Sequence, residues 1–503
     1  MFIRIVALIV FFIAISSDAL AAPVPKQPKM DAKTISAFEN IGGKYGVIAT
    51  GADGYMKFDR SPEGIAAGGL PSFWLPTVRQ GEASLSLPPV DMPFGLALTD
   101  GHYTGFTKGM AEMPLLTTII FGSYVSKDDQ LTNLIHAKGL TALRFSSGGT
   151  NDKALKIVGQ LKTLTRLEID WSPDVTASGW QHLTELKELT SFKTRTSKLG
   201  DAAMKMIGGW TKLRSLQIHG EAITDIGILE LASLKELDWL SIEGTKMTDA
   251  GLKIVRDFKR LVALRLSTTR MTAAEIRILK ELTELEELNL DNTGIDDAGI
   301  RELAGLTKLT ALHLLRTQVT GKELHPFTAL KSLELSHCPV TDEGLKVIGH
   351  IKSLAMLNLA NSRASEAGMK SLSNLKKLRE LNLAGTRVTD AGLSEIKHCV
   401  HLERLDLTYA MITDASTPMI ATFRSLKHLD LSYTKVSDRV LKELKVLSKL
   451  DTLLLTNTSV TDLGLDEIEH FPSLRYISLS GSKITRDAVE RLRKALPGCV
   501  IGA

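Results

Sequence analysis

The sequence lacks the short motifs that bring catalytic or cofactor chemistry to a protein. Its 503 residues contain no phosphate-binding glycine loop, no H-E-x-x-H, no C-x-x-C and no G-x-S-x-G. These absences remove the main sequence signals for nucleotide binding, metal-dependent hydrolysis, thiol redox chemistry and serine hydrolysis. We therefore expect a protein that is not an enzyme and that holds no cofactor.

The chain also has few cysteines and nearly equal numbers of basic and acidic residues. The three cysteines (Cys338, Cys399 and Cys499) are odd in number and far apart, which predicts free thiols rather than a disulfide framework. One of them lies in His398-Cys399-Val400-His401, but a metal site needs three or four convergent ligands, so we expect none there. A net charge of +4, from 61 basic and 57 acidic residues, gives no reason to expect nucleic acid as a partner.

Long apolar runs are missing except at the start of the chain. Residues 5–15 form an unbroken apolar run that follows Arg4 and precedes Ala19-Leu20-Ala21. This pattern is typical of a secretory signal peptide spanning residues 1–21 and cut after Ala21. The alternative, a membrane anchor, is disfavoured because eleven residues are too few to cross a core of about 30 Å. We expect no transmembrane segment after cleavage, and a secreted, periplasmic or cell-envelope location.

What the sequence does contain is a repeat, well seen in residues 378–401. Leucines at 378, 381 and 383 alternate as in a short strand. Thr389-Asp390 then marks a helix start, and Leu393 and Ile396 follow at helical spacing. Because one such unit cannot bury its own apolar face, the pattern predicts a stack of units.

The register recurs along most of the chain, and we number positions within a unit from its leading leucine, position 0. Leading leucines at intervals of 24 are Leu189, Leu213, Leu237, Leu261, Leu285 and Leu309, and then Leu354, Leu378, Leu402, Leu426, Leu450 and Leu474. Two intervals differ, with 25 residues from Leu164 to Leu189 and 21 from Leu309 to Leu330. In the short unit, Pro326 predicts the loss of the helix.

This pattern resembles the leucine-rich repeat, in the variety that carries I-T-D-x-G-L after the strand. Cys338 in LELSHCPVTDEGL and the C-x-x-L lead-in at Cys399 are similar to the cysteine-containing repeats of F-box receptors. Most units instead carry threonine at the position of Cys338, as in the repeat arrays of secreted bacterial proteins: Thr245, Thr269, Thr293, Thr317, Thr386, Thr434 and Thr458. The resemblance implies a right-handed α/β solenoid (a horseshoe) with parallel strands on its concave face.

The expected organisation has five parts. They are a signal peptide (1–21), a Pro-rich spacer (22–30), a small α+β N-terminal cap (31–115), about 16 repeats of about 24 residues (116–497) and a C-terminal tail (498–503). Within the cap we expect a helix at 31–41, a β-hairpin turning at 51–54 and a Pro-rich irregular segment with short strands at 85–87 and 96–98. Whether residues 60–115 only cap the stack or form a separate binding element stays open.

Several residues of the unit have expected structural roles. The threonines listed above should hydrogen-bond buried backbone in the loop. Thr272 with Glu275, and Thr320 with Glu323, fit a helix capping box. The glycine of T-D-x-G-L should permit close approach of neighbouring turns. Side chains at positions 2, 4, 6 and 7 should face the concave surface.

The predicted partner site lies on two successive units of that surface. Its residues are Arg404, Asp406, Tyr409, His428, Asp430 and Tyr433. Asp406 and Asp430 should stand one strand spacing apart as like charges, which a cationic group on a partner would relieve. The tyrosines offer rigid amphipathic contact area. In the alternative interpretation, Arg404 and nearby lysines already neutralise the pair and the tyrosines only cover strand ends.

A second, more scattered candidate patch lies earlier in the chain. It contains Trp171, Lys193, Arg195, His219 and Trp239. Together these features favour an exported, non-catalytic scaffold that binds a protein or peptide on its concave face. The alternative is an F-box-like substrate-receptor subunit of a ubiquitin ligase type complex. The signal peptide and the lack of an F-box-like helical trio argue against that alternative.

Overall fold

The computed structural model consists of two compact units, Met1–Thr269 and Arg270–Ala503, called here the N-terminal and C-terminal units. It describes residues 30–41, 43–51, 55–61, 69–75, 89–98, 113–122, 131–146, 148, 150–196, 198–269 and 271–502. The predicted signal peptide, nearly all of the Pro-rich spacer and the strand expected at 85–87 lie outside the described residues.

The N-terminal unit alternates short strands with helices. Its strands are β1 (Lys44–Thr50), β2 (Met56–Asp59), β3 (Leu70–Leu75), β4 (Phe94–Leu98), β5 (Leu116–Phe121), β6 (Ala142–Phe145), β7 (Arg166–Ile169), β8 (Ser191–Thr194), β9 (Ser215–His219), β10 (Trp239–Glu243) and β11 (Ala263–Arg265). Its helices, with 3₁₀ turns labelled η, are α2 (Ala32–Asn40), η3 (Thr132–His136), α5 (Asp152–Val158), α6 (Ala177–Gln181), α7 (Asp201–Gly208), α8 (Asp225–Leu229), η4 (Glu230–Ser233) and α9 (Asp249–Arg256).

The C-terminal unit continues the same alternation. Its strands are β12 (Glu287–Asn289), β13 (Ala311–His313), β14 (Ser332–Glu334), β15 (Met356–Asn358), β16 (Glu380–Asn382), β17 (Arg404–Asp406), β18 (His428–Asp430), β19 (Thr452–Leu454), β20 (Tyr476–Ser478) and β21 (Val500–Gly502). Its helices are α10 (Ala273–Ile276), η5 (Arg277–Glu281), α11 (Asp297–Glu302), α12 (Asp342–Ile348), α13 (Glu366–Leu372), α14 (Asp390–Ser394), η6 (Asp414–Ser416), α15 (Thr417–Ile420), α16 (Arg439–Leu444), η7 (Asp462–His470) and α17 (Arg486–Ala495).

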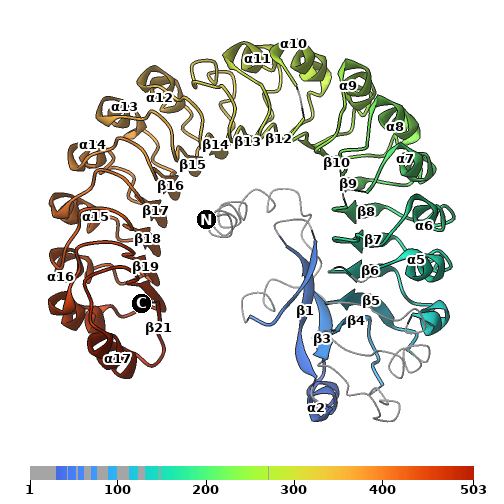
Figure 1. The fold of residues 1–503 in the computed structure, drawn as a ribbon, viewed down its shortest axis with the longest axis horizontal. Helices are drawn as coiled ribbons and strands as arrows, with labels where there is room; N and C mark the ends of the chain where they lie inside the picture. Colours follow the sequence, from blue (N-terminus) through green and yellow to red (C-terminus); the bar gives the residue numbers. More distant parts are fainter. Residues whose placement is uncertain are drawn as a thin grey trace. The chain divides into compact units, whose positions relative to one another are not determined.

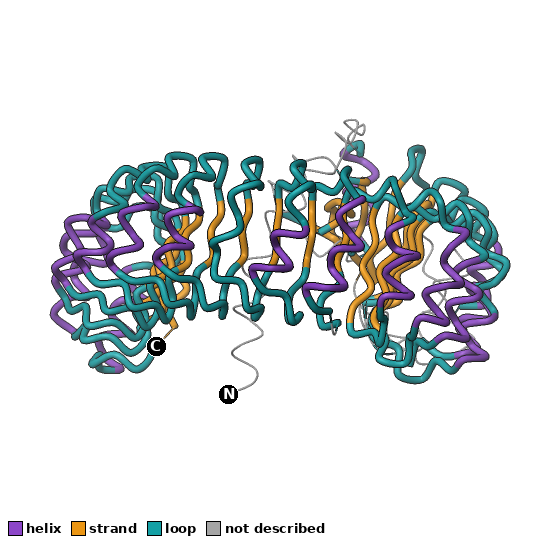
Figure 2. Tube along the Cα trace, turned by 90° about the horizontal axis from the view of Figure 1, so that it is seen from above, coloured by secondary structure: helices purple, strands orange, loops and turns teal. Residues whose placement is uncertain are grey.

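In each unit, neighbouring repeats pair through parallel strands, so the predicted fold class is confirmed. Strands line one side of the stack and helices the other (Figure 1), and Figure 2 shows the strands of each unit side by side. The pairing keeps the sequence register, with Leu381 opposite Leu357 and Leu405. It also extends beyond the predicted repeats, because β3 and β4 are parallel to β5 and β21 is parallel to β20.

The start of the N-terminal unit contains the predicted helix and hairpin. Asp31 caps α2 by accepting the Thr34 N–H at 2.9 Å, and buried Phe38 of that helix stacks on Phe73 of β3 at 3.8 Å between ring centroids. Strand β1 pairs antiparallel with β2, and its other edge pairs antiparallel with β3. The hairpin is thereby tied to the first strand of the parallel series.

Repeat leucines and the loop threonines form the core of the stack. Leu381 and Leu383 are fully buried. Six of the seven loop threonines donate their hydroxyl to the carbonyl three residues earlier, as Thr386 does to Leu383 at 2.6 Å. This bond satisfies a buried backbone carbonyl, as predicted. Thr245 is buried as well, but among the described residues its hydroxyl has no partner.

The 21-residue unit has no helix between β13 and β14, as Pro326 predicts. The capping box is present at Thr272, whose N–H donates to Glu275 at 2.6 Å. The prediction of a second capping box at Thr320 is wrong. Without a helix, Glu323 is not placed to cap one, and its carboxylate instead pairs with the Arg301 guanidinium at 2.7 Å.

A hydrogen-bonded clamp, not foreseen from the sequence, joins successive repeats through the T-D pair of T-D-x-G-L. The aspartate of one repeat accepts both the backbone N–H and the hydroxyl of the threonine at the start of the next helix. These distances are 2.8 and 2.6 Å for Asp225 with Thr248, 2.9 and 2.6 Å for Asp390 with Thr413, 2.7 and 2.7 Å for Asp438 with Thr461, and 2.8 and 2.8 Å for Asp462 with Thr485. The same threonines cap the helices or 3₁₀ turns that they begin.

The glycine of the motif makes room for this clamp. A Cβ added to Gly251 would lie 2.7 Å from the Asp225 carboxylate oxygen, and one on Gly464 would lie 2.6 Å from that of Asp438. In addition, the Gly251 N–H donates to Asp225 at 2.9 Å. The prediction that this glycine permits close approach of neighbouring turns is confirmed at both positions.

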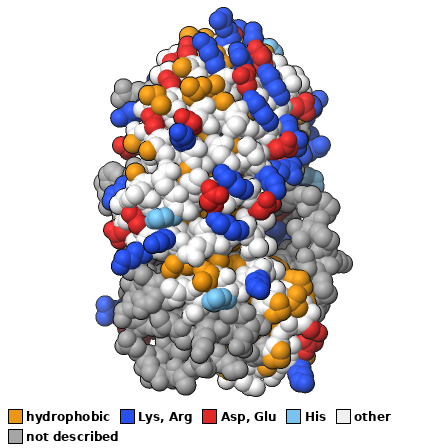
Figure 3. Space-filling view, turned by 90° about the vertical axis from the view of Figure 1, so that its right-hand side faces the viewer, with side chains coloured by type: hydrophobic (Ala, Val, Ile, Leu, Met, Phe, Trp, Pro, Cys, Tyr) orange, Lys and Arg blue, Asp and Glu red, His pale blue; other side chains and the backbone are white. Residues whose placement is uncertain are grey.

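The outer surface carries charges of both signs. On the side of the N-terminal unit seen in Figure 3, basic and acidic side chains are interspersed. Ion pairs also join residues 24 apart, such as Lys212 with Glu188 at 2.6 Å and Lys308 with Glu284 at 2.7 Å. No helix among the described residues combines the length and the apolar character needed to cross a bilayer.

We predict that Leu381→Ala or Leu383→Ala lowers the free energy of unfolding of the C-terminal unit by about 2–5 kcal/mol, because each leaves a cavity between stacked turns. Chemical denaturation followed by circular dichroism measures the change. Leu463→Ala is the matched control, since Leu463 is 85% exposed. Equal midpoints for the core and control variants would contradict the strand assignment.

We also predict that Asp462→Ala lowers the denaturation midpoint at pH 7, whereas Asp466→Ala in the same η7 turn has little effect because Asp466 is exposed. The N–H and hydroxyl of Thr485 hold the pKa of Asp462 below its usual value. A depressed carboxylate pKa stabilises the fold above the unfolded pKa and ceases to do so as the pH falls through the folded pKa. The difference between the two variants should therefore disappear in acid, and a difference that persists there would exclude an ionic clamp.

Candidate binding surface on the strand face

The predicted partner site occupies β17 and β18 of the C-terminal unit. These strands pair in parallel with Arg404 opposite His428 and Asp406 opposite Asp430. The 24-residue spacing thus places the two carboxylates side by side, as predicted. All four side chains are half-buried, which leaves part of each open to solvent.

The two carboxylates also bind the turns that follow their own strands. Asp406 accepts the Thr408 N–H at 2.9 Å and its hydroxyl at 2.6 Å, and Asp430 accepts the Ser432 N–H at 2.8 Å. Burial, and then the charge of Asp430, raise the pKa of Asp406 to about 6. Burial likewise raises the pKa of Asp430. The fold therefore holds two carboxylates where each disfavours the ionisation of the other.

The cations around this pair have carboxylate partners of their own. Arg404 Nε lies 3.3 Å from Glu380 Oε1, and Lys427 Nζ lies 2.7 Å from Glu403 Oε2. Burial and the Arg404 charge lower the pKa of His428, so this imidazole is neutral at pH 7. Arg404 and Lys427 thus each have a carboxylate partner outside the Asp406–Asp430 pair.

Tyr409 and Tyr433, at position 7, form an exposed aromatic pair. Their rings stack with centroids 4.2 Å apart and planes 18° from parallel, and the residues are 60% and 37% exposed. Both have a φ of +59°, in the left-handed region that bulky residues rarely adopt. At the same position some units carry asparagine or glycine (Asn361, Gly385 and Asn457), and others carry Thr268, Arg316 and His337, also with positive φ. Two tyrosines are thus held in a conformation better suited to asparagine.

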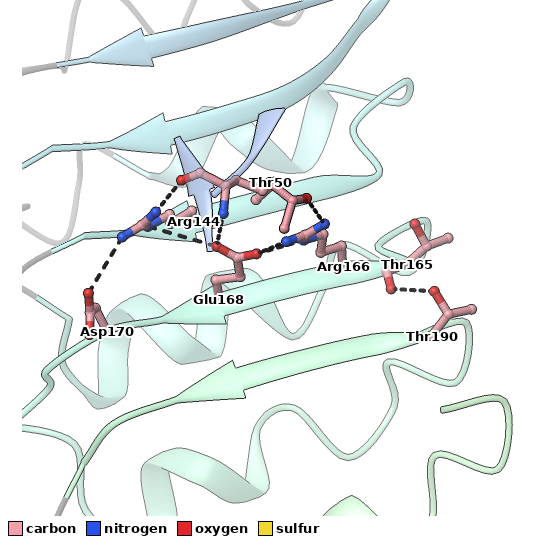
Figure 4. A network of polar contacts seen from close by, with 8 residues as sticks. Thr50, Arg144, Thr165, Arg166, Glu168, Asp170 and Thr190 are labelled. Atoms are coloured by element: carbon pink, nitrogen blue, oxygen red, sulfur yellow. Dashed lines mark hydrogen bonds and ion pairs between the residues drawn. The ribbon is translucent and has the colours of Figure 1, made fainter. Parts of the chain in front are cut away.

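The strand face of the N-terminal unit is occupied by the chain's own hairpin. The Met56 N–H donates to Glu168 Oε2 at 2.8 Å, and Arg144 donates to the Met56 carbonyl. Arg166 joins Glu168 at 2.5 Å and donates to the Thr50 hydroxyl at 3.0 Å (Figure 4). The position-4 side chains Arg144, Glu168 and Lys193 are consequently buried. The expectation that position 4 is an open surface is wrong at these strands, where the hairpin adds cover, and it is wrong also at Glu334, Asn358 and Asn382 of the C-terminal unit, which are buried as well.

Cations surround two aromatic rings at this place. The buried ring of Tyr55 lies under Arg144, Lys193 and Arg195, at 4.9, 5.7 and 5.0 Å from the ring centroid. Lys193 also lies 4.8 Å from the Trp239 centroid. The structure thus brings together Lys193, Arg195 and Trp239 of the second candidate patch and adds Tyr55, which sequence reasoning missed. Trp171 of that patch is 60% exposed, and no described ring contact joins it to Trp239.

In the cysteine region the thiol of Cys399 packs in the core, and the histidines near it in the sequence lie on the surface. Cys399 is buried, whereas His398 and His401 are exposed. Burial raises the pKa of the Cys399 thiol to about 11, and the buried Cys338 donates to the Leu314 carbonyl at 2.8 Å. Within the described residues no three His, Cys, Asp or Glu side chains are grouped so that they would hold a metal ion.

Comparisons with known proteins agree with this architecture. A family model described as Leucine Rich repeat matches residues 282–304, 328–349 and 374–397. The fold is similar to that of a leucine-rich repeat protein of Leptospira interrogans, with 24% identity, a TM-score of 0.52 and coverage of 79% of this chain and 97% of that one. It is also similar to a chain in the mouse RP105/MD-1 complex, with 17% identity, a TM-score of 0.53 and coverage of 84% and 77%. No curated protein matches the chain.

We predict that Asp406→Asn stabilises the C-terminal unit at pH 7 by about 1–2 kcal/mol, because each unit of raised pKa costs about 1.4 kcal/mol when the carboxyl is ionised. Asparagine keeps an oxygen that accepts the Thr408 N–H. The gain should shrink as the pH falls from 7 to 4, since protonated Asp406 no longer repels Asp430. Thermal unfolding across this pH range measures it, and a gain independent of pH would contradict the raised pKa.

Proposed function

We infer that this chain, which is a leucine-rich repeat protein, is a non-catalytic scaffold that binds a protein or peptide on the strand face of its C-terminal unit. The observation that supports this most strongly is the exposed Tyr409–Tyr433 stack on the same two repeats as the Asp406–Asp430 pair. Rigid aromatic side chains contribute much of the binding energy at protein interfaces. Side chains in left-handed backbone are costly to the fold, which favours a role in binding over one in packing.

The fold and its relatives support protein binding as the general role. Stacked repeats present a continuous row of strand side chains, a surface suited to extended partners. A chain of similar fold was solved in the mouse RP105/MD-1 complex. In this chain the hairpin covers the face of β6–β8, so a partner is expected on strands that the hairpin does not cover.

The location we propose is outside the cytoplasm. The signal-like residues 1–21 support export, with cleavage after Ala21. Free buried cysteines are consistent with stability gained from stacking rather than from disulfides, so the fold does not require an oxidising compartment. A secreted or envelope-associated binding protein fits both observations.

A displayed library of random twelve-residue peptides, selected on the full chain, tests the binding site. We predict that the selected peptides bind the double variant Tyr409→Asn/Tyr433→Asn at least tenfold more weakly than wild type. Two other repeats carry asparagine at this position, Asn361 and Asn457. Because asparagine tolerates the left-handed backbone there, thermal stability should be kept or slightly raised. Titration calorimetry with synthetic peptides measures the affinity.

The matched control is Tyr409→Phe/Tyr433→Phe, which keeps the stacked rings and should keep most of the affinity. Peptides that bind the asparagine variant as tightly as wild type would place the site elsewhere.

A further inference from the structure

The hairpin in the N-terminal unit shows how this strand face holds a polypeptide. The position-4 carboxylate of one repeat, Glu168, accepts a backbone N–H of the covering strand at 2.8 Å. The position-4 cation of the preceding repeat, Arg144, donates to the carbonyl of the same residue, Met56. The aromatic side chain next to it, Tyr55, is held by cations that the face supplies. Recognition therefore combines a backbone contact at position 4 with a cation–aromatic contact.

The surface on β17 and β18 also combines charged position-4 side chains with aromatic rings, but here the rings belong to the strand face. Its position-4 residues are the carboxylates Asp406 and Asp430, which stand opposite each other. Here the face supplies the aromatic rings, Tyr409 and Tyr433, instead of the cations. A complementary occupant of this surface must consequently supply the cation.

The electrostatics of the surface point the same way. Two carboxylates held one strand spacing apart, about 4.8 Å, repel each other. A cation placed between them relieves the repulsion, and the face of a tyrosine ring attracts it further. His428 does not compete for that place because its pKa is lowered. Arg404 and Lys427 lie within 3.3 and 2.7 Å of Glu380 and Glu403.

We propose that Asp406, Asp430, Tyr409 and Tyr433 bind a lysine or arginine side chain of an extended polypeptide segment. The ammonium or guanidinium group lies against the paired carboxylates, and its aliphatic stem lies on the tyrosine rings. A backbone N–H of the segment donates to one of the two carboxylates, as Met56 does to Glu168. This assignment rests on the proposed function, because it names the kind of ligand that the same surface takes.

The test reads the sequences of peptides selected on the full chain and then compares their affinities for wild type and for Tyr409→Asn/Tyr433→Asn. We expect one position of the selected peptides to be enriched in lysine or arginine. Replacing that residue by norleucine, which keeps the stem and removes the charge, should weaken binding to wild type at least tenfold. The protein is unaltered in this comparison, so its folding does not enter the result.

A second arm changes the protein. Asp406→Asn/Asp430→Asn should reduce the tenfold preference for lysine over norleucine to less than threefold, because the lysine peptide loses much more affinity than the norleucine peptide does. Affinity of the lysine peptide for wild type should fall between pH 7 and pH 5, as Asp406 takes up a proton, and the asparagine variant should lose this dependence. Lysine amide without the peptide should bind at least tenfold more weakly than the peptide.

The outcomes separate the two claims. Peptides that depend on the tyrosines but show no basic preference would overturn the cation assignment and leave the binding surface in place. Selected peptides that ignore the tyrosines, or the absence of any enriched peptide, would overturn both. Tight binding of lysine amide alone would overturn the polypeptide part, since it would make the ligand a small amine.

Discussion

The structure depends on a bond that each repeat makes with the next one, from an aspartate carboxylate to the N–H and hydroxyl of a helix-capping threonine. A single repeat has no way to bury its apolar side, and its aspartate has no threonine of a following repeat to bind. The bond that Asp390 makes with Thr413 recurs at Asp438 with Thr461 and at other repeats. Because donor and acceptor are about one repeat apart, the bond fixes the helices of neighbouring repeats relative to each other, and the parallel strands keep their register.

That register creates rows of equivalent side chains on the strand face, and function follows from which residues fill the rows. Where position 4 holds Arg144 and Glu168, the row binds the chain's own hairpin. Where it holds Asp406 and Asp430, the row leaves two half-buried carboxylates beside a tyrosine stack. The same repeat thus carries two different surfaces, one that the chain's own hairpin covers and one for which we propose a partner.

Much of this was predictable from the sequence, because the repeat is local. The spacing predicted the strands, the loss of the helix at Pro326 and the adjacency of Asp406 and Asp430. Two features were beyond such reasoning. The contact between Met56 and Glu168 joins residues 112 apart, and no periodicity connects a hairpin to a strand face. The aspartate–threonine clamp could not be recognised from the T-D motif alone, because the aspartate carboxylate lies in one repeat and the threonine that donates to it lies in the next.

Burial of the position-4 row was also missed, for a physical reason. Asn358 and Asn382 were expected on an open surface, yet they are 6% and 2% exposed. The Asn358 amide donates to Glu334 at 2.7 Å, and the Asn382 oxygen accepts the Ala384 N–H at 2.8 Å. Strands about 4.8 Å apart bring position-4 side chains of neighbouring repeats together, and these two asparagines are used up in hydrogen bonds within the protein. The left-handed backbone at Tyr409 and Tyr433 is likewise set by the loop and not by the residue type.

Hydrogen exchange at the threonine amides measures the central bond most directly. Exchange of the Thr413 N–H, which donates to Asp390 at 2.9 Å, should be as slow at pH 7 as that of the neighbouring strand amides. In Asp390→Ala it should accelerate at least tenfold while the Thr461 N–H, held by Asp438, stays protected. If the Thr413 amide of the wild type exchanges as fast as an open loop, the aspartate clamp does not hold the repeats together.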